Sequence, residues 1–270
     1  MRQLSISAAW EETRAIIARD GSLLMAVALA LVALPTAINS LLNPGGMNAV
    51  NATWWANLIA FASSIIALAG QLSLIRLAAS PSITVGAAIA HGLRRMPIYF
   101  VVILILVAAL FLIAILIVLV LGAMGVPLNA KPLPMSGPVV AATLLFLALL
   151  IFFGVRLLLS SPVASLEDAG PIAIIRRSWS LTSRHWLPLL GFLLVFVVGA
   201  VLLLTAVGAA VGSVVVLLLG PIQPLSAGAL IIALVQSLVN AAITTLFAVM
   251  LARIYLQLTD RAGQVGEVFR

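Results

Sequence analysis

Polar and apolar positions are so unevenly distributed along this chain that long apolar segments stand out between short polar ones. No Asp, Glu, Lys or Arg occurs between His185 and Ala252. A run of about 20 apolar residues is long enough to cross the hydrocarbon core of a membrane, where an unpaired charge is costly. The pattern predicts six transmembrane helices, at residues 23–42, 54–74, 98–121, 139–159, 187–204 and 230–251.

The apolar stretch 186–219 is too long for a simple crossing. As one helix it would measure about 51 Å, well beyond a hydrocarbon core of about 30 Å. The small residues of 205–213, among them Gly208 and Gly212, provide the natural place for a break. The helix must therefore break, tilt or fold along the membrane surface. We expect a break at 205–213, with residues 214–219 at the outer membrane surface.

The composition agrees with a membrane protein. Hydrophobic residues make up 64% of the 270 residues, charged residues only 8%, and the mean hydropathy is +1.30. Soluble domains carry about 25% charged residues. The sequence therefore predicts an all-α, polytopic membrane protein with one integral membrane domain over residues 1–270. Cysteine is absent, which excludes a thiolate nucleophile and a cysteine-ligated metal.

The charges predict the orientation of the six helices. With six spans, both termini lie on the same side of the membrane, and only Lys131 among the basic residues falls in a loop on the opposite side. Basic residues collect on the cytoplasmic side. We therefore expect a multi-pass protein of the bacterial inner membrane with both termini in the cytoplasm. The basic residues next to the spans favour membrane phospholipids as partners and argue against nucleic acid. The thirteen arginines assigned to the cytoplasmic side are Arg2, Arg14, Arg19, Arg76, Arg94, Arg95, Arg156, Arg176, Arg177, Arg184, Arg253, Arg261 and Arg270.

The cytoplasmic segments resemble one another. Before the third and the fifth span, the chain has Arg-Leu, then Ser-Pro, then an apolar-periodic stretch that ends in Arg-Arg: Arg76-Leu77, Ser80-Pro81 and Arg94-Arg95 in one, Arg156-Leu157, Ser161-Pro162 and Arg176-Arg177 in the other. Residues 5–19 form a comparable segment before the first span. The pattern predicts a unit of one short interfacial helix and two spans, repeated over 1–79, 80–160 and 161–258 and followed by a short cytoplasmic tail, 259–270.

The third interfacial helix has the clearest pattern. Ser165 and Asp168 are capping residues, and Ile172, Ile175 and Trp179 recur at helical spacing to form an apolar stripe. Such a helix lies among lipid headgroups and presents arginines to their phosphates. Two interpretations stay open: the arginines only anchor the helices, or they bind a specific lipid headgroup or partner protein. The candidate contact residues are Arg94, Arg95, Arg176, Arg177, Trp179 and Arg184.

This helix also carries a family resemblance. Residues 165–182 read SLEDAGPIAIIRRSWSLT, and Trp186 precedes the next span. The segment resembles the signature of the bacterial glycerophosphoryl diester phosphodiesterase membrane domain and its uncharacterised relatives. The resemblance implies a polytopic inner-membrane module, joined in some relatives to a soluble phosphodiesterase domain. The spans and short loops leave no room in this chain for that catalytic domain, so the resemblance does not imply the activity.

The residues that usually carry catalysis are sparse. The only histidines, His91 and His185, are far apart and show no metal-binding spacing, and no serine sits in a Gly-x-Ser-x-Gly turn. The acidic pairs Glu11-Glu12 and Glu167-Asp168 are adjacent residues, which point about 100° apart on a helix. We therefore expect no enzyme activity, no metal and no cofactor.

The last span carries a polar stripe. Gln236, Asn240 and Thr244 recur every fourth residue and so share one helix face. Such residues hold helices together by hydrogen bonds or line a pathway. Two functions therefore stay open. The first is a non-enzymatic module that binds anionic lipid or a partner protein through its arginine-rich cytoplasmic face, in envelope maintenance or in a larger assembly. The alternative is facilitative passage of a lipid or small neutral molecule.

Overall fold

The computed structural model describes residues 5–42, 54–80, 83–127, 130, 136–223 and 225–268, with side chains up to residue 259. Over these residues the fold is helical and contains no strand. Six helical segments are long and apolar enough to cross a membrane, which confirms the prediction of an all-α, polytopic membrane protein. They are Ile6–Leu42, Trp54–Ala79, Val85–Ala123, Gly137–Leu166, Trp186–Leu219 and Ala227–Thr259.

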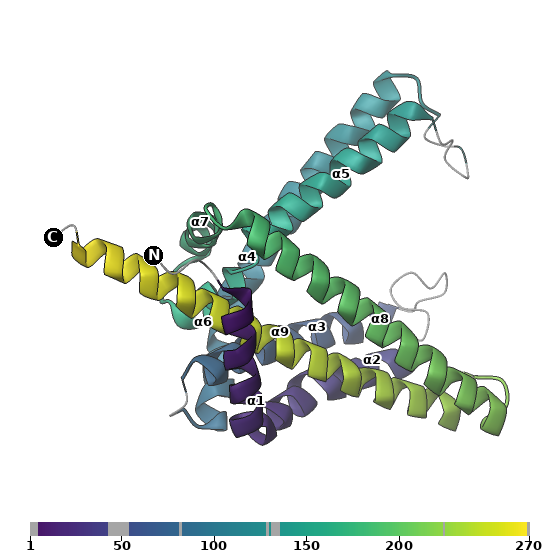
Figure 1. Ribbon diagram of the computed structural model, residues 1–270. Helices are drawn as coiled ribbons and strands as arrows, with labels where there is room; N and C mark the ends of the chain where they lie inside the picture. Colours follow the sequence, from purple (N-terminus) through teal and green to yellow (C-terminus); the bar gives the residue numbers. More distant parts are fainter. Residues whose placement is uncertain are drawn as a thin grey trace.

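The helices diverge from one polar end of the molecule. In Figure 1, the start of α1, the end of α9 and the short helices α6 and α7 lie on the left, whereas the tips of the α4–α5 and α8–α9 hairpins point to the upper and lower right. The helices are α1 (Ile6–Ala28), η1 (Leu29–Ala33, a π-helical turn), α2 (Leu34–Leu42), α3 (Trp54–Ala79), α4 (Val85–Ala123), α5 (Gly137–Arg156), α6 (Ser160–Leu166), α7 (Pro171–Thr182), α8 (Trp186–Leu219) and α9 (Ala227–Val268).

Two hydrophobic cores share α9. In one core, Ala248, Val249 and Ala252 of α9 pack against apolar residues of α1 and α3. In the other, Leu251 and Ile254 of α9 pack against α5, α6, α7 and the start of α8. The outer half of α4 has little cover from the protein, as the 66% exposure of Leu112 illustrates. Such side chains suit a lipid surrounding, because lipid tails are as apolar as leucine.

The break predicted in residues 205–213 is wrong. Helix α8 runs without interruption from Trp186 to Leu219 and includes both Gly208 and Gly212, so residues 214–219 belong to it. A glycine inside a helix costs only about 1 kcal/mol relative to alanine. An interruption in lipid would leave backbone groups without partners, at several kcal/mol each. The continuous helix is therefore the less costly arrangement.

Only one of the three predicted interfacial helices is a separate element. Helix α7 ends at Thr182, before α8 begins, but residues 5–19 continue into the first span and the stretch before the third span continues through Pro97 as α4.

The first span contains a π-helical turn, η1, just before Pro35. A proline ring clashes with the carbonyl four residues before it, which for Pro35 is the carbonyl of Leu31. Leu31 lies within η1, so the turn is found where the ring disturbs the helix.

Several predictions about the chain's organisation concern residues that the structure does not describe. The described residues do not include Pro81 of the repeated Ser-Pro pair, Lys131, Arg2 or the side chains of the tail beyond residue 259. The threefold repeat stays a prediction. Ser161 and Pro162, in contrast, are described, and they lie buried in α6 rather than on the surface.

Gly92 allows a close approach of α3 and α4. A Cβ atom at this position would lie 2.6 Å from the carbonyl oxygen of Ala69 and would also clash with the Ser73 hydroxyl. That hydroxyl is buried and donates a hydrogen bond to Ala69 O at 2.7 Å. Neither backbone nor hydroxyl can move away without loss, so the crossing requires glycine.

We expect Gly92→Ala to destabilise the protein by about 1–3 kcal/mol, because the new methyl group overpacks the α3–α4 contact. The matched control is Gly191→Ala, since a Cβ at Gly191 meets no atom within 4 Å. The control should be neutral, or stabilised by up to about 1 kcal/mol through helix propensity. Thermal unfolding of the detergent-purified variants at one scan rate measures both. Equal midpoints for the two variants would contradict the close approach.

Candidate functional site

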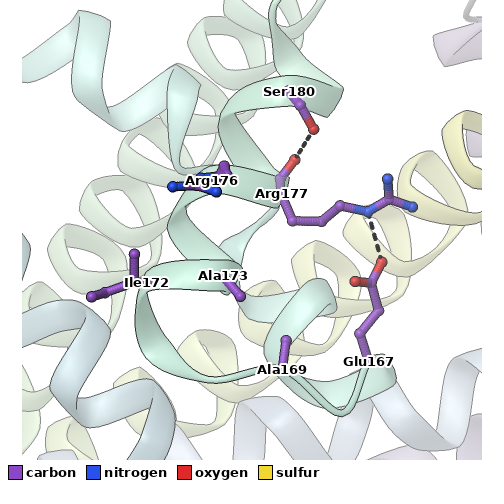
Figure 2. A pocket seen from close by; sticks show the side chains of 7 residues that line it. All are labelled: Glu167, Ala169, Ile172, Ala173, Arg176, Arg177 and Ser180. Carbon is purple, nitrogen blue, oxygen red and sulfur yellow. Dashed lines mark hydrogen bonds and ion pairs between the residues drawn. The ribbon is translucent and has the colours of Figure 1, made fainter.

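A pocket of about 620 Å³ opens beside α7 at the polar end of the molecule. Its volume is within the range of small-molecule sites. Figure 2 shows its lining, which combines a carboxylate, two guanidinium groups and a hydroxyl with small and apolar side chains. The lining residues are Glu167, Ala169, Ile172, Ala173, Arg176, Arg177 and Ser180.

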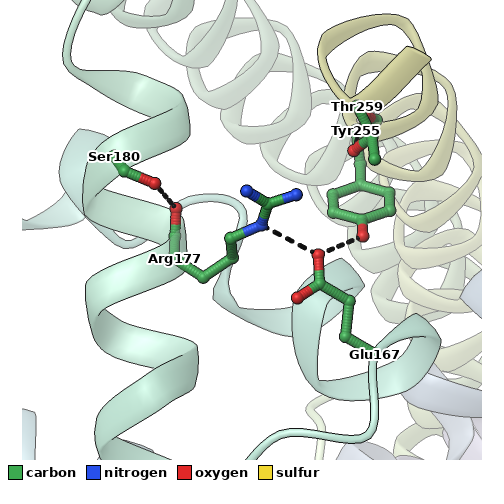
Figure 3. Close-up of polar contacts among 5 residues, drawn as sticks. All are labelled: Glu167, Arg177, Ser180, Tyr255 and Thr259. Carbon is green, nitrogen blue, oxygen red and sulfur yellow. Dashed lines mark hydrogen bonds and ion pairs between the residues drawn. The ribbon is translucent and has the colours of Figure 1, made fainter. Parts of the chain in front are cut away.

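Glu167 organises one wall of the pocket. Its Oε1 accepts a hydrogen bond from Arg177 Nε at 3.0 Å and another from the Tyr255 hydroxyl at 2.6 Å. Figure 3 shows this carboxylate between α7 and α9, with Ser180 Oγ donating to the backbone oxygen of Arg177 at 2.8 Å. Hydrogen bonds to ionised groups are the stronger kind. The three side chains therefore join α9 to the α6–α7 connection and restrict the Arg177 guanidinium.

The charges of the pocket do not cancel. Glu167 balances Arg177, but Arg176 is exposed, points away from this pair and forms no ion pair among the described residues. The lining therefore carries a net charge of one positive unit. Arg177 uses only its Nε on Glu167, and its terminal nitrogens point away from the carboxylate in Figure 2. A monoanionic ligand would complete the charge balance.

The structure brings only two of the predicted arginines into this pocket, Arg176 and Arg177. Arg95 forms an ion pair with Asp168, in the connection before α7, and is 12% exposed. Arg94 and Arg184 are exposed and do not line the pocket. The predicted set is thus distributed over the polar end rather than gathered at one point.

Trp179 does not line the pocket. Its ring lies edge-on to Phe152 of α5, with 5.7 Å between the ring centroids, and also packs against Phe153. This residue therefore holds α7 against α5, and it does not share a site with Arg176 and Arg177.

Tyr255 is the residue of this site that the sequence interpretation missed. It lies 88 positions from Glu167 along the chain, and nothing in the local pattern of either residue indicates the contact. Glu167 itself was interpreted only as a member of an acidic pair whose side chains point apart on a helix. The fold supplies both partners of its carboxylate.

The polar stripe of α9 contributes at least one contact between helices. Gln236 Nε2 donates to the carbonyl oxygen of Leu204 in α8, at 3.3 Å. Asn240 and Thr244 are half-buried on the same helix face. The Gln236 contact is the kind of interhelical hydrogen bond by which polar residues hold membrane helices together.

Among the described residues, no three side chains of His, Cys, Asp or Glu come together in a group that could hold a metal ion. His91 Nε2 lies 2.7 Å from the backbone oxygen of Ser165. Ser165 in turn donates its hydroxyl to Leu72 O at 2.9 Å. These contacts fix the buried helix α6 between α3 and α4.

Six long apolar helices and a basic pocket at one end define this chain as a multi-pass membrane protein with an all-α fold. Comparison with family models identifies which family it is in. The chain belongs to a family described as a domain of unknown function (DUF7847), whose model matches residues 4–258. This match does not link the chain to the glycerophosphoryl diester phosphodiesterase membrane domain that residues 165–182 resemble. Searches of curated proteins and of solved structures found no match.

Tyr255→Phe should destabilise the protein by about 1–2 kcal/mol, since it removes a hydrogen bond to a charged group. In a Glu167→Gln background the same change should cost clearly less, because the acceptor no longer carries a full charge. Thermal unfolding of the two single variants, the double variant and the unmodified protein forms a double-mutant cycle. Equal costs of Tyr255→Phe in both backgrounds would show that the charge of Glu167 does not strengthen this hydrogen bond.

Proposed function

We propose that this protein is a non-enzymatic inner-membrane module that binds the headgroup of an anionic phospholipid in the α7 pocket. The observation that carries the proposal is the net positive charge of a pocket that combines two arginines with apolar walls. Phosphatidylglycerol and related lipids carry a phosphodiester with one negative charge. That charge matches the single positive charge left by Arg176, Arg177 and Glu167.

The position of the pocket supports a lipid rather than a soluble ligand. Helix α7 adjoins the first residues of α8, which is one of the membrane-crossing candidates, and this supports a position of the pocket at the level of the headgroups. Ile172 is 70% exposed beside it and suits the interface between headgroup and acyl chain. A role in envelope maintenance and the resemblance of residues 165–182 to a membrane module are compatible with this proposal.

Binding of a partner protein by the same arginines is the second version of this proposal. Facilitative passage of a lipid or small neutral molecule is a different function, and no contact of the described residues favours it specifically. Gln236 uses its amide on the backbone of α8, which supports a packing role for the stripe. We therefore propose the headgroup site.

The proposal predicts that Arg176→Ala combined with Arg177→Ala loses bound anionic phospholipid. Each basic residue near a membrane surface contributes about 1 kcal/mol, so the pair should weaken binding by about tenfold or more, allowing for the partial neutralisation of Arg177. Native mass spectrometry of the full chain, released from bacterial membranes in mild detergent, measures the lipid that stays bound.

The matched control is Arg14→Ala combined with Arg19→Ala, which removes the same charge from exposed positions of α1. The control should keep its lipid. Equal retention by both double variants would overturn the proposal. Loss of a co-purifying protein, instead of a lipid, from the Arg176 and Arg177 variant would assign these arginines to a protein partner.

The proposed orientation places both termini and α7 in the cytoplasm. The chain has no cysteine, so Ser183→Cys and Gln223→Cys each introduce a single label site, at exposed residues before and after α8. A membrane-impermeant maleimide should label Gln223→Cys on intact cells and should label Ser183→Cys only after permeabilisation. Labelling of Ser183→Cys on intact cells would show that the orientation is the opposite of the proposed one.

A further inference from the structure

One carboxylate oxygen in the α7 pocket is left for a ligand. Glu167 Oε1 accepts from both Arg177 Nε and the Tyr255 hydroxyl, whereas Oε2 has no hydrogen bond among the described residues. The Glu167 side chain is 29% exposed, and Oε2 does not belong to the buried side-chain atoms that lack a partner. This oxygen is therefore open to the pocket. In Figure 2 it points towards the side on which Ala169 and Ala173 lie.

The direction of Glu167 Oε2 is fixed by the contacts of the other oxygen. Oε1 lies 3.0 Å from Arg177 Nε on α7 and 2.6 Å from the Tyr255 hydroxyl on α9, so two helices hold the carboxylate. An ionised carboxylate can only accept hydrogen bonds. A few well-placed polar groups orient a ligand in a pocket and give it specificity. The α7 pocket thus presents a prearranged acceptor to whatever occupies it.

The positive charge of the pocket lies on a different side from this acceptor. Arg176 and Glu167 both line the cavity of about 620 Å³. Figure 2 shows Arg176 and Glu167 on different sides of the pocket, with the small side chain of Ala173 between them. Arg176 forms no ion pair among the described residues. A ligand that extends across Ala173 therefore meets a cationic donor at one end and an anionic acceptor at the other.

We propose that the α7 pocket selects a glycerol headgroup, whose hydroxyl donates to Glu167 Oε2 while its phosphate contacts Arg176. This inference rests on the proposed function and names the feature of the headgroup that the site recognises. A phosphate alone does not account for Glu167, because a carboxylate repels it. A donor carried next to the phosphate offsets this repulsion, since a hydrogen bond to an ionised acceptor is of the stronger kind.

A hydroxyl fits the charge of the pocket better than an ammonium group does. The pocket lining carries one net positive unit, from Arg176, Arg177 and Glu167. A phosphodiester with a glycerol headgroup carries one negative charge and cancels it. A phosphodiester with an ammonium headgroup is neutral overall and leaves the positive unit uncompensated. The ammonium lipid is therefore the competitor that the test has to exclude.

The test compares two lipids that differ in the donor. Phosphatidylglycerol and phosphatidylmethanol each carry one phosphodiester charge, but the methyl ester has no headgroup hydroxyl. The full chain in dodecyl maltoside is mixed with equal amounts of both lipids, with identical acyl chains, and native mass spectrometry measures their ratio in the complex. The variant is Glu167→Gln. The matched control is Glu11→Gln, which removes the same charge from an exposed position of α1.

We expect the unmodified protein and the Glu11→Gln control to bind about tenfold more phosphatidylglycerol than phosphatidylmethanol, because only the former donates to the charged oxygen. Glu167→Gln keeps an oxygen for Arg177 and Tyr255, but a neutral hydrogen bond is roughly half as strong, so the ratio should fall to about threefold or less. Its binding of phosphatidylmethanol should rise, because a negative charge has left the pocket. A purely structural role of Glu167 would instead weaken both lipids alike.

The possible failures separate this inference from the proposed function. Equal amounts of the two lipids on the unmodified protein would overturn the inference and leave the headgroup site standing, and so would an unchanged ratio in Glu167→Gln. Binding of neither lipid would overturn both. In a parallel competition, preference for phosphatidylethanolamine over phosphatidylglycerol would assign Oε2 to an ammonium group and overturn the choice of glycerol. If Glu167→Gln does not fold, the ratio on the unmodified protein decides.

Discussion

The packing of residues 248–255 of α9 is the constraint on which the rest of the structure depends. Ala248, Val249 and Ala252 close one hydrophobic core, and Leu251 and Ile254 close the other. In lipid, apolar side chains gain little by leaving the solvent, so helices associate through close packing and polar contacts. Fully buried alanines at 248 and 252 let neighbouring backbones approach. This short segment of α9 thus contributes to both cores, as α3 does through Leu72 in one core and Leu74 in the other.

Helix α9 also fixes the positions of side chains at the polar end of the molecule. Tyr255 follows directly after the packed segment, and its hydroxyl fixes the Glu167 carboxylate that orients Arg177. On the other side, Ser178 and Thr182 fasten α7 to the end of α5. Helix α7 is therefore held between α5 and α9, with one face towards the pocket and the other towards Arg156. A change in the packing of α9 would reach the pocket through Tyr255.

Hydropathy and charge were sufficient to predict the six spans, because lipid excludes charge and demands continuous helices. The same reasoning was wrong for residues 205–213, where the need to pair backbone groups outweighs the low helix propensity of Gly208 and Gly212. It predicted Arg176 and Arg177 as candidates but not the partners that orient them. Glu167 and Tyr255 meet only through the fold, since neither residue has a local signal for a contact across 88 positions. The burial of α6 was missed for a similar reason: its serines look polar until Ser165 is seen to donate to the backbone of α3.

The distribution of polar groups limits where this protein can act. The described loops and helix ends towards the tips of the α4–α5 and α8–α9 hairpins carry no charged side chain, whereas the connection between α6 and α7, helix α7 itself and the end of α5 carry arginines and the Glu167 carboxylate. Under the proposed function, headgroup phosphates lie at the level of this end and lipid tails beside the exposed leucines of α4 and α8. Because Glu167 offsets one of the two pocket arginines, attraction to a negative surface alone does not account for the arrangement. Glu167 weakens the binding of every anion in the pocket, but it also fixes Arg177 in one direction and leaves Arg176 to supply the charge. Under the proposed function, this arrangement is consistent with selectivity for a particular headgroup.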